Sequence, residues 1–270
     1  MSTVESGSGP ARWWGEFTLP SDGMGRWQIG PLQLWVQRLA GEWRVAWRAG
    51  EELMQPLAEV SLPLPIERPP ASMQISRFSF ADSAKVLRLV PALADRPVVV
   101  RPELPLFIPA GESTTMFVST PIWVRIFAGY GAEPLLEIPS LQPSDTWFGP
   151  DTRIGELCYA SRTLAHTRIE EIIPRPHRAI TPVRIRNHAN SVLAIERLSV
   201  PVPLLTLSAN AQGYFWTQSV TLERRLRDDK ALLQLGDMTV PGSATLQSVC
   251  GPRQYEDERT VLRALSRFFG

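Results

Sequence analysis

The chain has 270 residues, a formal net charge of +1 and 44% hydrophobic residues. This length suffices for one large or two ordinary domains with a substantial core. The nearly neutral charge argues against a dedicated nucleic-acid binder, which usually carries a strong basic excess. All basic residues except Lys85 and Lys230 are arginine. Arginine forks suit carboxylates and phosphates, but codon usage in a GC-rich genome also favours arginine. The second explanation is favoured, because the arginines are scattered and mostly balanced by acids.

The N-terminal segment and the cysteines indicate a reducing compartment. Residues 1–11 are polar and lack the apolar run of a signal peptide, so they predict a disordered tail. No stretch has the length of a membrane span. Cys158 and Cys250 are too few for a disulfide framework in so long a chain. We therefore expect a soluble, cytoplasmic protein with reduced thiols.

Short strands dominate the pattern from the N-terminus onward. The 25 prolines and 18 glycines interrupt most segments, and helical periodicity is scarce, which is typical of an all-β protein. The first predicted strands form a β-meander with short links; they are 12–19, 25–30, 31–38 and 41–48. A connection rich in proline and glutamate follows at 51–71. Further strands are predicted up to about residue 148, and a second block extends from about residue 151.

A faint internal repeat suggests how these strands are grouped. Residues 104–124 align without gaps on residues 202–222, and the offset of 98 residues approximates one immunoglobulin-like sandwich. The sequence therefore predicts an all-β fold of two tandem immunoglobulin-like β-sandwich domains. The expected divisions are a tail at 1–11, a Trp-rich domain at 12–148, a second sandwich at 149–252 and a C-terminal helix at 253–270.

The C-terminal helix is predicted from apolar spacing. Val261, Leu262, Leu265, Phe268 and Phe269 recur at helical intervals, with acids before them and arginines among them. Such a helix would either pack on its own domain or dock on a partner.

Six of the nine tryptophans lie in the first 47 residues. Successive side chains of a β-strand point to opposite faces. This alternation places Trp43 and Trp47 on an inward face and Trp35 on a mixed, half-exposed face. Trp13 and Trp14 point to opposite sides of their strand, so at most one of them belongs to the core.

Motifs for catalysis are missing from the sequence. There is no phosphate-binding glycine loop and no nucleophile elbow. The spacing of His166, His177 and His188 fits no zinc module. Cys158 with His166 or His177 remains a conceivable pair, but nothing nearby marks the thiol as activated. We predict no catalytic, cofactor or metal site, and hence not an enzyme.

The surplus tryptophans leave three interpretations open. Both faces of the meander are packed within the protein, or one face binds a protein partner, or one face is a platform for a carbohydrate or other small ligand. The candidate partner-contact residues are Trp13, Trp14, Trp35, Arg44, Arg48, Phe268 and Phe269.

Four motifs carry a resemblance to a known family. They are "WWGEF…L", "W.IGPL.LWV.R…EWR.A", "TPIWVRI" and "IERLSVPVPLL…YFWTQSVTLERR". Between about Trp13 and Leu226 the chain resembles the domain of unknown function 432 family of archaeal and bacterial proteins. The family brings no assigned activity or catalytic residues to this sequence. Its members look similar to proteins encoded near small-conductance mechanosensitive channels, so the resemblance implies an accessory role with a membrane channel as partner.

Overall fold

The computed structural model describes residues 12–51, 57–81, 84–149, 153, 155–163, 165–225, 230–238, 245–255 and 260–264. The expected all-β class is confirmed, because the described helices are two short 3-10 turns, η1 (Ile169–Glu171) and η2 (Val202–Leu204). None of the helices in these ranges is long and apolar enough to cross a membrane.

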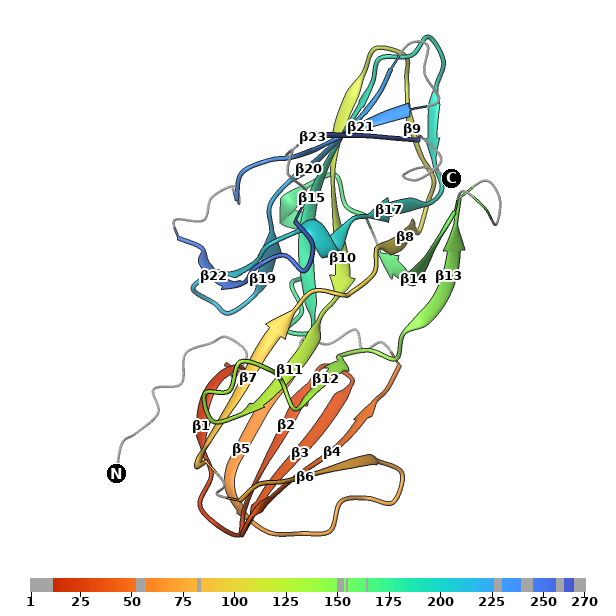
Figure 1. The fold of residues 1–270 in the computed structure, drawn as a ribbon. Helices are drawn as coiled ribbons and strands as arrows, with labels where there is room; N and C mark the ends of the chain where they lie inside the picture. The colour runs from red at the N-terminus through yellow and green to blue at the C-terminus, as the bar shows by residue number, and fades with distance from the viewer. Residues whose placement is uncertain are drawn as a thin grey trace.

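The lower half in Figure 1 contains two sheets. The five-stranded sheet has the order β5-β2-β3-β4-β6 and is antiparallel throughout. Its strands are β2 (Gly23–Ile29), β3 (Leu32–Leu39), β4 (Glu42–Ala49), β5 (Ala58–Pro65) and β6 (Gln74–Ser79). Three of the four predicted meander strands, at 25–30, 31–38 and 41–48, thus form the centre of this sheet.

The second sheet of the lower half has the order β1-β7-β11-β12. Its strands are β1 (Gly15–Thr18), β7 (Val86–Ala92), β11 (Trp123–Ala128) and β12 (Leu136–Pro139). The first predicted strand therefore pairs with β7 and not with the meander. The rings of Phe17 on β1 and Trp27 on β2 meet edge to face at 5.3 Å, which joins the two sheets through their apolar sides.

The upper half contains an eight-stranded sheet, a four-stranded sheet and a two-stranded pair. The eight-stranded sheet comprises β10 (Ser113–Pro121), β15 (Arg178–Asn187), β18 (Leu207–Ala209), β19 (Phe215–Thr217), β20 (Val220–Arg224), β21 (Lys230–Leu235), β22 (Gln247–Cys250) and β23 (Thr260–Ala264). The four-stranded sheet has the order β13-β14-β8-β17, with β8 (Val98–Pro102), β13 (Ser144–Phe148), β14 (Glu156–Thr163) and β17 (Leu198–Val200). The pair consists of β9 (Leu106–Ile108) and β16 (Leu193–Ile195).

Strand pairing does not follow the order of the chain. The segment that contains β8, β9 and β10 precedes β11, yet it pairs with β14, β16, β17 and β15 of the upper half. The expected tandem arrangement of two immunoglobulin-like sandwiches is therefore not confirmed. The two segments of the faint repeat also differ, because β10 is one continuous strand whereas β19 and β20 are separate.

The expected C-terminal helix is not seen. Residues 260–264 form the edge strand β23, which pairs antiparallel with β21. These residues form a strand despite their helical spacing, because the edge of β21 offers backbone groups that need hydrogen-bond partners. Val261 and Leu262 also suit a strand. Phe268 and Phe269 lie outside the described residues, as do residues 1–11.

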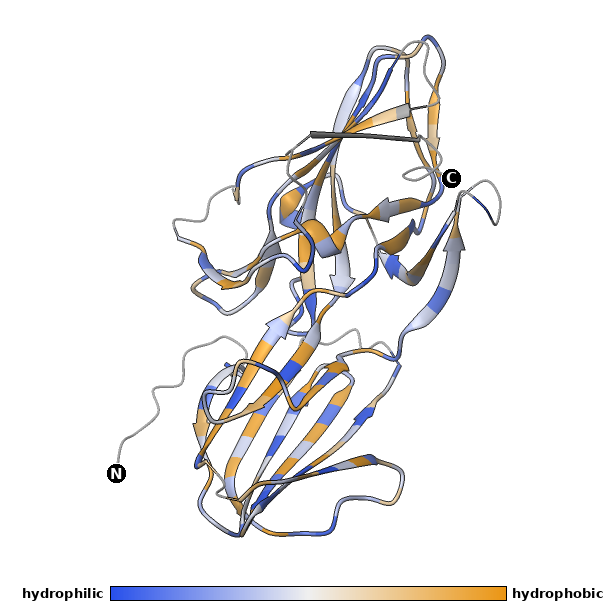
Figure 2. Ribbon diagram, in the orientation of Figure 1, coloured by the Kyte–Doolittle hydropathy of each residue, from blue (hydrophilic) through white to orange (hydrophobic). Residues whose placement is uncertain are grey.

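The alternation predicted for the meander is confirmed. Trp43 and Val45 are buried, while Trp47 is half-buried and packs against the same core. Figure 2 shows this alternation of hydrophobic and hydrophilic residues along the strands of the lower half. The core cluster continues from Trp27 and Trp43 to Phe215 and Leu233, so both halves share one hydrophobic interior.

Candidate functional sites

The outer face of the five-stranded sheet carries the half-exposed tryptophan that the sequence predicted. Trp35 on β3 is flanked by Arg26 on β2 and Ala46 on β4. The guanidinium carbon of Arg26 lies 4.1 Å from the centroid of the Trp35 ring, a cation–π contact that covers part of the indole. Next in the same row, Ile75 on β6 is 53% exposed. This row thus presents apolar surface between charged groups.

Ion pairs organise the rest of this outer face. Arg77 donates to both carboxylate oxygens of Glu42 at 2.8 and 2.6 Å, and Arg44 donates to the same carboxylate. These hydrogen bonds lower the pKa of Glu42 from 4.5 to about 2. Arg26 pairs with Glu67, whose backbone oxygen accepts a hydrogen bond from Gln37. The connection between β5 and β6 is thereby tied to the sheet.

A hollow of about 310 Å³ lies on this face. Its lining residues are Trp35, Gln37, Arg44, Ala46, Arg68, Pro69, Ile75 and Arg77. Arg48 lies on the same side of β4 and donates to Ser72 Oγ at 3.0 Å and to Gln33 Oε1 at 2.9 Å. The structure thus brings Trp35 and Arg44 to one hollow and places Arg48 on the same face.

Trp13 and Trp14 lie elsewhere, at the junction of the two halves. Trp13 is 1% exposed, and its Nε1 donates to the backbone oxygen of Pro176 at 3.1 Å. Its ring meets Phe215 edge to face at 5.9 Å. Trp14 is half-buried, with the guanidinium of Arg12 at 3.8 Å from its ring centroid. Only one of the two is a full core residue, as the alternation predicted, and Trp13 holds the halves together.

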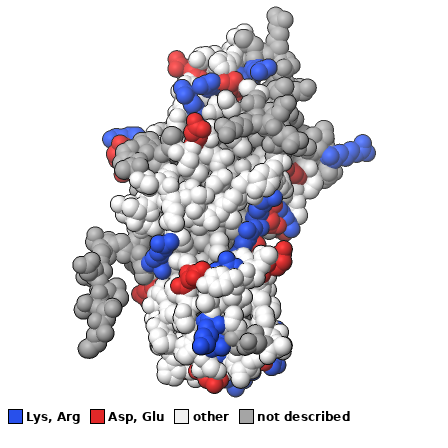
Figure 3. All heavy atoms as spheres, turned by 60° about the vertical axis from the view of Figure 1, so that its left-hand side comes forward, with Lys and Arg blue, Asp and Glu red and all other residues white. Residues whose placement is uncertain are grey.

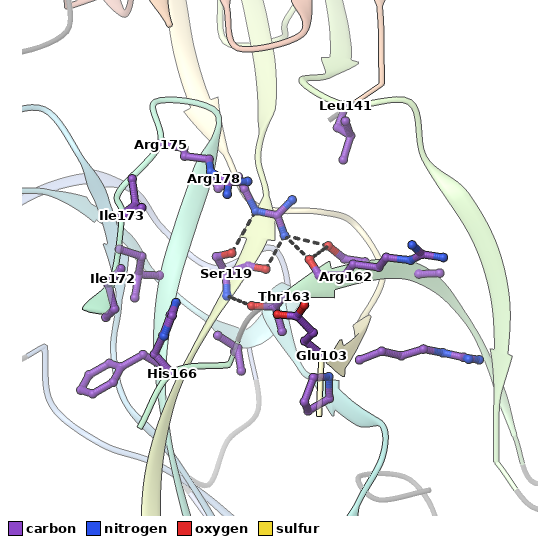
Figure 4. A pocket seen from close by; sticks show the side chains of 17 residues that line it. Glu103, Ser119, Leu141, Arg162, Thr163, His166, Ile172, Ile173, Arg175 and Arg178 are labelled. Atoms are coloured by element: carbon purple, nitrogen blue, oxygen red, sulfur yellow. Dashed lines mark hydrogen bonds between the residues drawn. The ribbon is translucent and has the colours of Figure 1, made fainter. Parts of the chain in front are cut away.

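A larger cavity of about 670 Å³ lies in the upper half (Figure 4). It is formed by β8, β10, β14, β15 and the connection from β14 to β15. Its lining residues are Arg101, Pro102, Glu103, Phe117, Val118, Ser119, Leu141, Ala160, Ser161, Arg162, Thr163, His166, Ile172, Ile173, Arg175, Arg178 and Ile180. The volume lies within the usual range of small-molecule sites.

Arg178 fixes the base of this cavity. Its side chain is buried, and its Nε donates to Ser119 Oγ at 3.0 Å. Its Nη2 donates to the backbone oxygen of Ser119 at 2.6 Å, to Ser161 Oγ at 2.8 Å and to the backbone oxygen of Arg162 at 3.2 Å. Figure 4 shows these bonds fanning from Arg178 toward β10 and β14. Arg178 therefore ties three strands together around the cavity.

Cys158 has the surroundings of a core thiol. It packs with Val99 and Phe148, and burial, together with the nearby Glu156, raises its pKa to about 12. A thiol with this pKa is protonated at neutral pH and is a poor nucleophile. The surroundings of Cys158 therefore do not activate its thiol.

The histidines considered with Cys158 have other neighbours. His166 lines the large cavity, with its Nδ1 3.3 Å from Oε2 of Glu171. His177 is buried against Gly30, where an added Cβ would lie 2.1 Å from its Nδ1. Gly30 has φ of +55°, so both the backbone and this close approach require glycine. Among the described residues, no group of three or more His, Cys, Asp or Glu could hold a metal ion.

Reasoning from the sequence did not identify the cavity. Its basic residues come from segments far apart in the chain, and none of Arg101, Arg162 or Arg178 belongs to a motif.

The surface charge is mixed. Figure 3 shows one face of the molecule, on which acidic and basic side chains are interspersed and do not form one large patch of a single sign.

The family resemblance is confirmed by comparison with family models. A model described as "Protein of unknown function (DUF432)" matches residues 13–269, which extends the resemblance to nearly the whole chain. The searches of curated proteins and of solved structures gave no match.

Proposed function

We propose that this chain, which belongs to the DUF432 family, is a non-catalytic interaction module that binds an acidic segment of a partner protein. The supporting observation is the hollow on the outer face of the five-stranded sheet, where Trp35 and Ile75 lie among arginines. Tryptophan and arginine are the side chains that protein interfaces favour most at their energetic centres.

The charges of this outer face favour an acidic partner. Basic side chains there outnumber acidic ones: Arg26, Arg44, Arg48, Arg68 and Arg77 stand against Glu42, Glu59 and Glu67. An acidic segment laid across the hollow gains electrostatic attraction and covers the exposed part of Ile75. Because the charges are accessible to solvent, the affinity will fall as salt is added.

We extend the proposal to a partner embedded in a membrane, with this chain on the cytoplasmic side. The support is the family resemblance, which implies an accessory role beside a mechanosensitive channel.

Photo-crosslinking in the native cells tests this proposal. A crosslinking amino acid is placed at Ile75 or, as a matched control, at Phe107, which is 63% exposed in the upper half. We expect one discrete adduct from position 75, recovered in the membrane fraction, and none from position 107. The double variant Trp35→Ser with Arg44→Glu should abolish the adduct while leaving the far-UV circular dichroism unchanged. Equal adducts from both positions, or an adduct insensitive to the double variant, would contradict the proposal.

A carbohydrate platform on Trp35 is the second candidate, because the hollow contains an accessible indole. The stacked Arg26 occupies part of that ring, which a pyranose would have to displace, so the protein partner is favoured. Tryptophan fluorescence during titration with a panel of oligosaccharides separates the two. A saturable change that disappears in Trp35→Phe would support the carbohydrate site instead.

A further inference from the structure

Two arginines lie side by side one row before the ends of the parallel strands β8 and β14. Arg101 on β8 pairs in register with Arg162 on β14, so both side chains leave the same face of the sheet. The flanking strands stop one row or more earlier: β17 pairs with β8 only as far as Val100, and β13 with β14 only as far as Ala160. Among the described residues, therefore, no strand pairs with the outer side of either arginine to provide a counter-ion.

Two like charges in directly neighbouring positions repel each other. Both arginines line the large cavity and both are exposed. Within the described ranges, neither guanidinium has an ion pair or a hydrogen bond to a protein group. Glu103, which directly follows β8, is the single acid among the described lining residues. The arrangement leaves an excess of positive charge at this end of the cavity.

The opposite wall carries apolar side chains beside His166 and Arg175. Ile172 and Ile173 belong to the connection before β15, and Phe117 and Ile180 come from β10 and β15. Ile173 is 63% exposed although its side chain is aliphatic. In Figure 4, Ile172 and Ile173 lie on one side of Arg178, and Arg162 extends on the other. The cavity thus places two exposed arginines opposite a cluster of aliphatic side chains.

We propose that this cavity binds a small organic anion, with a phosphate or carboxylate head on Arg101 and Arg162 and an apolar body against Ile172 and Ile173. A guanidinium presents a fork of donors that matches the oxygens of both head groups, and two adjacent forks surround an oxyanion. Binding would relieve the repulsion between the arginines and remove Ile173 from water. The site is separate from the outer face of the five-stranded sheet and is independent of the function proposed above.

Titration calorimetry with the purified full chain tests the site. The probes are octyl phosphate, octanoate, inorganic phosphate and the neutral octyl glucoside, all below their micellar concentrations. We expect one saturable site for octyl phosphate or octanoate, with the tighter of the two identifying the head group. Inorganic phosphate and octyl glucoside should each bind about tenfold more weakly or worse, since each lacks one half of the recognised structure.

Three variants separate the two ends of the cavity. Arg101→Gln and Arg162→Gln should each weaken binding of the alkyl anions about tenfold, the usual effect of losing a charge-assisted hydrogen bond. Ile173→Gln should weaken octyl phosphate but leave inorganic phosphate unchanged. Arg184→Gln is the matched control, because Arg184 is an exposed arginine on β15 outside the cavity.

Specific results would overturn the proposal. They are an absence of saturable binding by both alkyl anions, equal binding of octyl glucoside, or an equal loss in Arg184→Gln. Should Arg162→Gln fail to fold, Arg101→Gln carries the test, because its guanidinium makes no hydrogen bond or ion pair with the described residues.

Discussion

At the scale of single residues, Glu42 shows how one carboxylate orders the outer face of the five-stranded sheet. It accepts hydrogen bonds from Arg44 on its own strand and from Arg77 on β6. Without Glu42, these two guanidiniums would repel each other beside the hollow. The carboxylate therefore holds them as a fixed part of the surface proposed to meet a partner.

The lowered pKa of Glu42 predicts a dependence of stability on pH. Because its folded pKa of about 2 lies below its ordinary value of 4.5, its contribution to stability is complete above pH 4.5 and is lost as the pH falls toward 2. Urea unfolding at a series of pH values will show a smaller loss of unfolding free energy in this window for Glu42→Gln than for the wild type. Glu59→Gln, on the same face but outside this ion-pair cluster, is the control and should follow the wild type. A Glu42→Gln protein that loses as much stability as the wild type would contradict this assignment.

At the scale of elements, Asn187 joins the ends of three strands. It is fully buried at the end of β15, and its Nδ2 donates to the backbone oxygens of Ile108, Pro109 and Ser191 at 2.8–3.0 Å. Its Oδ1 accepts from the backbone amide of Ala189 at 3.3 Å. One side chain thus satisfies backbone groups after β9, after β15 and before β16.

Replacing this amide will be costly. Asn187→Ala leaves the buried carbonyl of Ile108 and the part-buried carbonyls of Pro109 and Ser191 without this donor, so we expect a loss of about 2–4 kcal/mol in unfolding free energy. Chemical denaturation with far-UV circular dichroism measures it. Asn210→Ala is the comparison, since the Asn210 side chain accepts a single backbone hydrogen bond within one turn, from Tyr214 at 2.9 Å, and should cost about 1 kcal/mol or less. Equal effects of the two substitutions would show that Asn187 does not link the strands in this way.

The sequence allows individual strands to be predicted better than their partners. Alternation correctly placed Trp43 and Val45 in the core and Trp35 on the outer face, because period two is a local property of a strand. The spacing of Val261 and Leu262 was misread as helical, since a short apolar run suits either structure and only the open edge of β21 decides it. Arg101 and Arg162 meet only because β8 and β14 pair in parallel across a long stretch of chain, and no local pattern reports that pairing.

At the scale of the whole molecule, the lower half is interrupted by strands that belong to the upper half. β7 and β11 are neighbours, with Ala92 opposite Trp123, yet the chain between them leaves to form β8, β9 and β10. Apolar residues on these strands, such as Val98, Val100 and Met116, are buried by partners that follow residue 156.

This topology predicts how fragments behave. Residues 12–140 alone should aggregate or fail to unfold cooperatively, because strands β8 to β10 lack their partners. The same fragment with residues 94–121 replaced by a short Gly-Ser turn, and with Trp13→Ser to remove the indole that packs on the upper half, should be monomeric and unfold in one transition, since Ala92 and Trp123 already face each other. Size-exclusion chromatography and thermal denaturation of both fragments provide the measurement. A monomeric, cooperative fragment that retains residues 94–121 would contradict the dependence on later strands.

The same interruption has a consequence during synthesis on the ribosome. Strand β10 ends at Pro121, and its partner β15 is complete only at Asn187. At about 5–20 residues per second, the exposed strand waits roughly 3–13 seconds for that partner to be translated. Within this interval the last lower-half strands, β11 and β12, are completed, while the nine-residue strand β10 is still unpaired. We therefore expect a chaperone to bind the segment that contains β10 during synthesis.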